Sequence, residues 1–213
     1  MATIKLNKKI VYTGKIQVVT GMHIGGTNTA MGIGGPDKFI VRNPLSGIPY
    51  IPGSSLKGKM RALIEMADGT IDAKEGATSD PDSNAGYLFG TASGSEKNRA
   101  SRIIVRDAEM DVSHPELFSK CDLPFAESKT ESSIDRVRAR STPRTFERVP
   151  AGAEFKFEII INVFDTEDEK RLCDTFKRAV SLLENDYLGG QGSRGYGQVK
   201  IVFDNIDGVT KTF

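Results

Sequence analysis

A glycine-rich segment near the carboxyl end of the chain has the residue types of an anion-binding loop. Residues 188–199 read LGGQGSRGYGQV and place five glycines around one serine and one arginine. Glycine lets the main chain come close to a ligand, so that free amide groups can face phosphate oxygens. Ser193 and Arg194, which follow Gly192, would add a hydroxyl donor and a positive charge. We therefore expect a phosphate-binding loop; the alternative is a flexible turn between a helix and a strand.

A second candidate phosphate site is the run PGSSLKGKMR, residues 52–61. It should open a helix in which Ser54 or Ser55 is the N-cap. Lys57 and Arg61 would then lie one turn apart on one face, where the free amides of the helix start also favour an anion. The alternative is an ordinary serine cap beside a solvated basic face. The run lacks the residue order of a P-loop, so hydrolysis of nucleoside triphosphates is not expected.

Positive charge is concentrated between residues 129 and 148. The whole chain carries 29 Lys and Arg against 28 Asp and Glu, a formal net charge of only +1. A nucleic-acid surface must therefore come from local segregation of charge. Basic residues outnumber acidic ones in this stretch. The basic residues are Lys129, Arg136, Arg138, Arg140, Arg144 and Arg148, and the acidic residues are Glu131, Asp135 and Glu147.

Composition excludes several classes of protein. With 213 residues, 38% hydrophobic and 27% charged, the chain can form one domain that carries large insertions. Cys121 and Cys173 are isolated and the two histidines lie in unrelated contexts, so neither a zinc site nor a disulfide framework is expected. The basic amino-terminal segment is followed by no apolar region, and nowhere do about eighteen apolar residues run together. We expect no membrane partner and a cytoplasmic location.

The periodicity of apolar residues predicts the elements that position these sites. Strict alternation predicts strands, and the spacing of Leu56, Met60, Leu63 and Ile64 predicts a helix. The predicted order begins with a strand at 10–18, with a break at Gly14, and a helix after 52. Strands near 102–109 and 154–163 follow, then a helix opened by a Thr166/Glu169 capping box, and finally a strand at 198–203. This is an α+β, ferredoxin-like (RRM-like) order with loop insertions and a long excursion from about 110 to 152. No RNP-type aromatic motif appears, so base stacking on the sheet is not expected.

Four motifs together resemble one protein family. GMHIGG (21–26), NPLSGIPYIPGSSLKGKMR (43–61), RVRARSTPRTFERVPAG (136–152) and the glycine-rich loop occur in the order seen in the repeated backbone subunits of type III-A CRISPR effectors, the Csm complexes. These subunits belong to the RAMP superfamily of RNA-binding proteins. The resemblance implies a single RAMP domain over residues 1–213. Its palm would comprise about 1–20, 52–67, 100–111 and 153–213, and a thumb hairpin would be inserted at about 124–150.

The resemblance also implies an activity and partners. Copies of such a subunit polymerise head to tail along a CRISPR RNA beside other Csm subunits, and they cleave guide-paired target RNA at regular intervals. The family's cleaving aspartate ends an IGxxD segment after the first strand, and IGGPD at 33–37 matches with Asp37, although Pro36 stands where relatives often have an apolar residue. Asp37 could hold a divalent cation, with Mg²⁺ as the expected ion, or accept the proton of the attacking 2′-hydroxyl. The sequence leaves both roles open.

The remaining expected site residues bind RNA or are acidic alternatives. The RNA-binding set comprises His23, Ser54, Ser55, Lys57, Arg61, Arg136, Arg138, Arg144, Gly192, Ser193 and Arg194. A satisfied structural histidine is the alternative for His23. Asp107 and Glu147 are secondary acidic candidates, although Asp107 could cap its strand and Glu147 could pair with Arg148. Two other functions stay open: an architectural RNA-binding subunit that cuts nothing, and a precursor-processing endoribonuclease with His23 as base.

Overall fold

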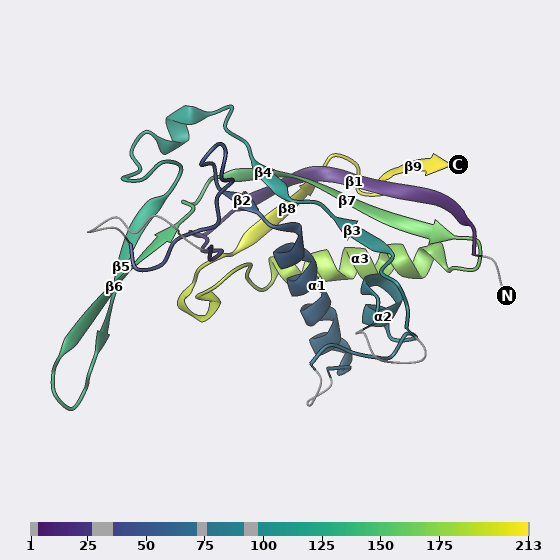
Figure 1. Cartoon of the computed structure of the whole chain (residues 1–213), viewed down its shortest axis with the longest axis horizontal. Coiled ribbons are helices and arrows are strands. Elements are labelled where there is room, and N and C mark those ends of the chain that lie inside the picture. The colour runs from purple at the N-terminus through teal and green to yellow at the C-terminus, as the bar shows by residue number, and fades with distance from the viewer. Residues whose placement is uncertain (1–3, 27–35, 72–75, 92–97, 213) are drawn as a thin grey trace.

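The computed structural model describes residues 4–26, 36–71, 76–91 and 98–212 (Figure 1). This part of the chain forms a mixed α/β structure with a seven-stranded antiparallel sheet and a separate two-stranded hairpin. The sheet contains β1 (Leu6–Val18), β2 (Tyr50–Ile51), β3 (Ile103–Val105), β4 (Ala108–Met110), β7 (Glu154–Phe164), β8 (Val199–Phe203) and β9 (Val209–Thr212). The helices are α1 (Gly53–Asp68), α2 (Asn84–Phe89) and α3 (Glu169–Glu184), with 3-10 turns η1 (Pro115–Phe118) and η2 (Gly192–Arg194).

The centre of the sheet is the long antiparallel pair β1 and β7. Their register places Ile10 opposite Ile161 and Ile16 opposite Phe155, so apolar residues of both strands share one face. The sheet order is β2-β4-β7-β1-β8, with β3 also on β7 and β9 also on β1. β1 is continuous through Gly14, where a Cβ would lie 2.1 Å from the carbonyl oxygen of Val202. The expected break is therefore wrong, and the glycine instead permits close strand packing.

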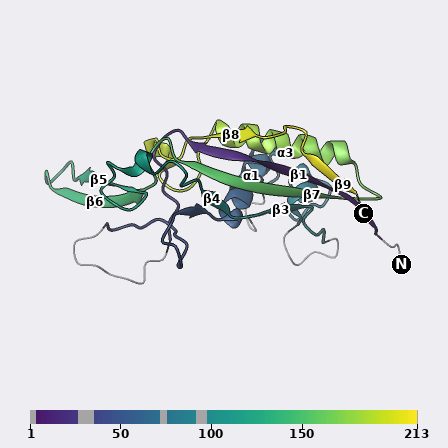
Figure 2. The ribbon, with the colours of Figure 1, turned by 90° about the horizontal axis from the view of Figure 1, so that it is seen from above.

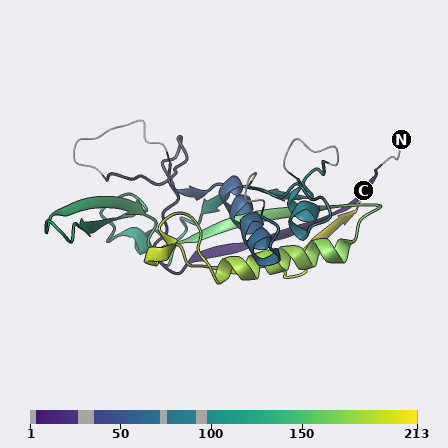
Figure 3. The ribbon, with the colours of Figure 1, turned by 90° about the horizontal axis from the view of Figure 1, so that it is seen from below.

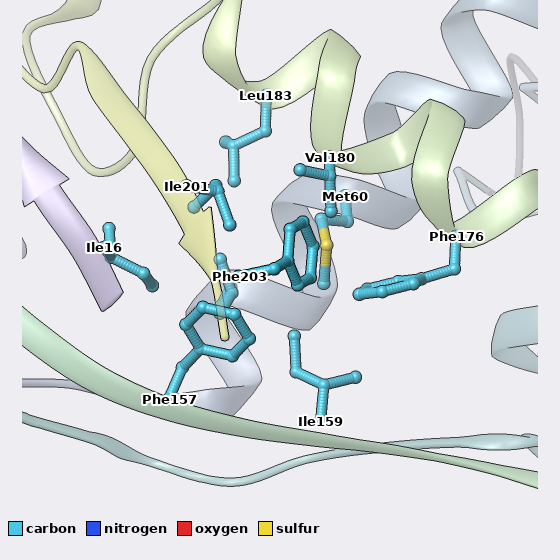
Figure 4. Close-up of a pocket in the computed structure, with 10 residues that line it drawn as sticks. Ile16, Met60, Phe157, Ile159, Phe176, Val180, Leu183, Ile201 and Phe203 are labelled. Carbon is cyan, nitrogen blue, oxygen red and sulfur yellow. The ribbon is translucent and has the colours of Figure 1, made fainter. Parts of the chain in front are cut away.

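One face of the sheet is covered by α1 and α3 (Figure 3), whereas Figure 2 shows the strands from the other face, with α1 and α3 behind them. Side chains from both helices and from β1, β7 and β8 converge in the core (Figure 4). They leave an apolar cavity of about 10 Å³, lined by Ile16, Leu56, Met60, Phe157, Ile159, Phe176, Val180, Leu183, Ile201 and Phe203. This is no more than one water molecule needs, so the cavity is a packing gap and not a ligand site.

Several predicted boundaries are wrong. The strand expected near 102–109 is divided into β3 and β4, which pair with β7 at different positions. Pro52, not a serine, is the N-cap of α1. Asp168 caps α3 by accepting the Arg171 amide, so the Thr166/Glu169 capping box does not form. α2 and β9 were not expected from the sequence, because α2 follows a polar insertion and β9 is a short exposed edge strand.

The hairpin consists of β5 (Glu127–Ile134) and β6 (Ser141–Arg148) and projects away from the rest of the molecule (Figure 1). Its register runs without a shift from Glu127 opposite Arg148 to Ile134 opposite Ser141. Phe146 near its base is buried, whereas every residue from 132 to 144 is exposed. Among the described residues, the hairpin is therefore anchored at its base alone. None of the described helices is long and apolar enough to span a membrane.

Candidate nucleic-acid interface

Asp37 lies on a short extended segment that pairs with the outer edge of β6 through backbone hydrogen bonds. The Asp37 amide donates to the Thr145 carbonyl at 2.9 Å, and the Thr145 amide donates to Oδ2 of Asp37 at 2.7 Å. One residue further on, the Glu147 amide donates to the Lys38 carbonyl at 2.9 Å. Asp37 is exposed, so its carboxylate faces solvent from a backbone held at the base of the hairpin. Residues 33–35 of the IGGPD motif lie outside the described residues.

The carboxylate of Glu147 is buried beside this segment. It accepts the backbone amide of Ile40 at 3.0 Å and forms an ion pair with Arg42. The pairing expected with Arg148 is wrong, because Arg148 forms an ion pair with Glu127 at 2.6 Å. Glu147 is only 4% exposed and its oxygens are engaged, so it holds the 37–42 segment against β6 and does not face solvent.

His23 joins three parts of the interface. Its Nδ1 lies 2.6 Å from the Glu147 carbonyl, which can only accept, so that nitrogen carries the proton. Its own carbonyl accepts the Gly190 amide at 2.8 Å, and its ring meets Phe146 edge-on at 5.9 Å. The side chain is buried. His23 therefore ties the segment after β1 to the hairpin and to the glycine-rich loop, an arrangement that fits the structural alternative for this residue.

The glycine-rich loop presents Ser193 and Arg194 to solvent. Both residues are exposed and belong to η2. A Cβ on Gly192 would lie 2.1 Å from the Tyr187 ring, so only glycine lets the loop fold over that ring. The Arg194 guanidinium donates to Oε1 of Gln191 at 2.6 Å. The loop is thus folded around its own side chains, with a hydroxyl and a cation on its outer surface.

Tyr196 connects the glycine-rich loop to the hairpin. Its hydroxyl donates to Oε1 of Glu131 at 2.8 Å, and Lys129 and Arg148 lie over its ring at 4.6 and 4.9 Å. Burial and the bond to the Glu131 carboxylate raise the pKa of Tyr196 to about 12. Sequence reasoning assigned no role to Tyr196 or Glu131. The signal available was the tyrosine of the SRGYG pattern, but its partner 65 residues away could not be read from it.

At the start of α1 the expected phosphate ligands are engaged with the protein. Lys57 donates to Oγ of Ser101 at 2.9 Å, and burial and the nearby Arg61 lower the pKa of Lys57. Arg61 pairs with Glu65 at 2.8 Å and donates to the Thr78 carbonyl at 3.1 Å.

The first backbone amide of α1 is also hydrogen-bonded within the protein. The Gly53 amide donates to Oδ1 of Asp107 at 2.7 Å, so Asp107 supplies a negative charge to the helix start and does not cap its own strand. The Ser54 side chain is exposed and Ser55 is half-buried, but neither makes a cap hydrogen bond.

The distal hairpin presents cations to solvent. Arg136 and Arg138 lie in the turn between β5 and β6, and Arg144 lies on β6; all three are exposed. Asp135 orders the turn by accepting the amides of Val137 and Arg138 at 2.9 and 3.1 Å. A ligand can therefore reach these guanidinium groups without displacing a layer of protein.

Asp37 supplies the one carboxylate of the candidate cation site. Over the residues that the structure describes, no group of three His, Cys, Asp or Glu side chains could hold a metal ion. Mg²⁺ is commonly held by one or two carboxylates together with substrate phosphates and water. The residues present fit such an ion only where phosphate oxygens complete its shell.

The comparisons with known proteins agree with the motifs. Residues 15–200 match the RAMP superfamily. The chain is 42% identical over 207 residues to the "CRISPR system Cms endoribonuclease Csm3" of Enterococcus italicus, covering 96% of this chain and 95% of that protein. It is 40% identical to the Methanocaldococcus jannaschii protein of the same name, covering 94% of this chain and 81% of the relative.

Two solved structures share the fold. The Methanopyrus kandleri Csm3 crystal structure gives a TM-score of 0.60 at 24% identity and covers 93% of this chain and 76% of that chain. A chain in the cryo-EM structure of the Type III-B Cmr-beta bound to cognate target RNA gives 0.62 at 20% identity and covers 93% of this chain. This chain spans 62% of that chain's length. By its sequence match and its relatives, the chain belongs to the RAMP superfamily and, within it, to the Csm3 family.

Proposed function

We propose that this chain is a CRISPR RNA-binding backbone subunit of a type III-A interference complex and that it cleaves guide-paired target RNA. The observation that carries this proposal is the exposed carboxylate of Asp37 at the base of a hairpin whose tip presents arginines. Support comes from the 42% identity to a protein named as an endoribonuclease. The guide and target RNA would be the ligands, with sequence specificity left to base pairing.

Three regions of the protein would contribute to the RNA-binding surface. Ser193 and Arg194 on the glycine-rich loop would hold guide phosphates, and the exposed arginines of the hairpin would follow the duplex. The start of α1 would contribute Ser54, Ser55 and Lys57, with Arg61 acting mainly within the protein. Such contacts position RNA without reading bases, which suits a subunit that must accept any guide sequence.

Asp37 would act directly on the cleaved phosphodiester. Its Oδ2 is already an acceptor for the Thr145 amide, which orients the carboxylate. A bound divalent cation, with Mg²⁺ as the expected ion, would stabilise charge that develops on the phosphate. Without direct metal contact, the same carboxylate could accept the proton of the attacking 2′-hydroxyl.

The fold supports the architectural part of the proposal. The order β8-β1-β7 with β3 and β4 beyond, and with α1 and α3 on one face, fits a ferredoxin-like palm, and β5 and β6 fit its thumb. Copies would associate head to tail, because a heterologous interface that does not close builds a filament along RNA. Other Csm subunits would complete the complex, which would work in the cytoplasm.

The test is cleavage by the assembled complex carrying Asp37→Ala. We expect guide-matched RNA to be bound as before, whereas the cleavage rate falls about 10²- to 10⁴-fold, as for loss of a general acid, base or metal ligand. Denaturing gels report cleavage and filter binding reports the complex. Asp207→Ala is the matched control, because Asp207 is an exposed aspartate paired with Lys177. Undiminished cutting by Asp37→Ala would contradict the catalytic assignment.

Two other functions give different results in the same assay. An architectural subunit would yield no fragments from wild-type complex with magnesium. A precursor-processing nuclease that used His23 as base would keep cutting in the presence of a chelator. The burial of His23 and its bond to the Glu147 carbonyl favour the target-cleaving proposal over the histidine mechanism.

A further inference from the structure

The carboxylate of Glu131 lies within a group of basic side chains. Its Oε1 accepts the Tyr196 hydroxyl at 2.8 Å and lies 3.5 Å from Nζ of Lys129, while Oε2 lies 3.6 Å from the Arg194 guanidinium. Arg144 is directly opposite Glu131 in the hairpin register, so the two side chains leave the same face. An acidic group thus occupies the middle of the surface on which RNA phosphates are proposed to bind.

The position of this carboxylate is not explained by hydrogen bonding alone. A neutral amide oxygen could accept the Tyr196 hydroxyl equally well in geometry, so the bond requires an acceptor and not a charge. The Tyr196 hydroxyl, Lys129 and Arg194 lower the pKa of Glu131, which keeps it ionised at neutral pH. The negative charge is therefore a permanent feature of the surface.

The charge acts on Arg194, the cation of the glycine-rich loop. The Arg194 side chain is 59% exposed and is directed towards both Gln191 and Glu131. A phosphate bound at the loop must either draw Arg194 away from Glu131 or come within a few ångströms of a like charge. At about 4 Å in water, such an interaction changes an equilibrium constant about fivefold.

We propose that Glu131 competes with RNA phosphate for Arg194 and thereby weakens RNA binding at the glycine-rich loop. This inference rests on the proposed RNA-binding function. A fivefold loss affects an RNA that touches only this loop most visibly, because its occupancy is already low. A guide that contacts several cationic sites at once stays bound, since its affinity is the product of many contacts. Glu131 would thus reduce the retention, by the free subunit, of RNA that reaches this loop alone.

The experiment measures binding of a fluorescein-labelled, mixed-sequence 40-nucleotide RNA without CRISPR repeats to the isolated full chain. We expect Glu131→Gln to bind this RNA about fivefold more tightly than wild type at 50 mM salt, with a smaller gain at higher salt because the repulsion is screened. Glu158→Gln is the matched control. It makes the same charge change and releases Arg106 from an exposed ion pair on the sheet, and it should leave the affinity unchanged.

The sign of the effect decides the inference. Equal or weaker binding by Glu131→Gln would show that Glu131 only anchors Tyr196 and Arg194, and would overturn the proposed competition. Glu131→Thr, a second neutral variant suited to a strand, should reproduce the gain if glutamine disturbs folding. In an Arg194→Ala background the gain should vanish; a gain that persists would overturn the role of Arg194. Wild-type chain that binds no RNA at all would instead refute the proposed function.

Discussion

The start of α1 and the distal hairpin carry similar positive charge but use it differently. Arg61 is paired with Glu65 and bonded to the Thr78 carbonyl, and Lys57 is bonded to Ser101. On the hairpin, Arg136 and Arg144 are exposed, and no described element forms a second layer over them. Formal charge at a position is therefore a poor measure of the charge that a ligand can reach.

Burial explains the difference. α1 packs against α2 and α3, so a cation at its edge is partly removed from water and must find a partner inside the protein. Within the part of the chain that the structure describes, the hairpin contacts the rest of the molecule only near its base, and its distal arginines are exposed. A hydrated arginine can exchange water for phosphate at little cost, whereas a partnered one must first break its existing bonds. RNA affinity should therefore depend more on the hairpin than on Arg61.

Among the variants that test this comparison, Arg61→Ala should have the largest effect, and the quantity it changes is the free energy of unfolding. The change leaves the carboxylate of Glu65, which is only 4% exposed, without its cation. Breaking such a pair from one side typically costs about 3 kcal/mol, so we expect the free energy of unfolding to fall by about that amount. Urea denaturation followed by circular dichroism measures it. Arg178→Ala is the control, since its more exposed pair with Asp68 should contribute less than about 1 kcal/mol.

The opposite result would reverse the assignment of Arg61. If Arg61→Ala kept full stability but lost RNA affinity, the guanidinium would be available to phosphate and the two regions would be equivalent. The original expectation for this residue would then stand.

The next largest effect is expected from the triple variant Arg136→Ala, Arg138→Ala and Arg144→Ala. Three lost phosphate contacts should reduce single-stranded RNA affinity about 50-fold at 0.15 M salt and lower the log–log salt slope by about 2. The loss should be the same for every RNA sequence, because such contacts read no bases. Titrations at several salt concentrations measure both quantities. An unchanged melting temperature would confirm that these side chains play no part in the core, and a loss restricted to particular sequences would contradict the phosphate assignment.

Some of these features could be read from the sequence and others could not. The alternation of Phe155, Phe157 and Ile159 predicted β7, and the apolar spacing after Pro52 predicted α1, because both patterns are local. The i, i+4 spacing of Arg61 and Glu65 also offered a local signal for their ion pair. The pair between Arg42 and Glu147 joins residues 105 positions apart, and only the folded chain brings them together.

The same limit applies to the candidate site. The resemblance to RAMP proteins selected Asp37 and the glycine-rich loop, but the attachment of Asp37 to Thr145 spans 108 positions. Likewise, Asp107 was considered as an acid or a strand cap, whereas it meets the amide of Gly53 at the start of α1. Residue type and spacing selected the candidate side chains, whereas the long-range contacts of each one are set by the folded chain.

The smallest effect is expected from Lys57. Its side chain is bonded inside the protein, as that of Arg61 is, but we expect it to contact phosphate, as the hairpin arginines do. Lys57→Ala should weaken RNA binding about fourfold at 0.15 M salt, as for one phosphate contact. Because burial and Arg61 lower the pKa of Lys57, the wild-type side chain loses its charge at a lower pH than an ordinary lysine. RNA affinity should therefore fall on raising the pH towards about 10, more than in Lys57→Arg, where the charge persists. Titration with alkali-resistant 2′-O-methyl RNA measures this difference.

Stability should change in the opposite direction over the same pH range. In the folded chain Lys57 releases its proton at a lower pH than in the unfolded chain, so the unfolded state binds more protons between the lowered pKa and the ordinary value of 10.5. Wild type should accordingly gain stability relative to Lys57→Arg as the pH rises through this window. Urea denaturation at each pH measures the gain. Parallel curves for the two proteins in both assays would mean that Lys57 is as well hydrated as the hairpin arginines, and the contrast between the two regions would then rest on Arg61 alone.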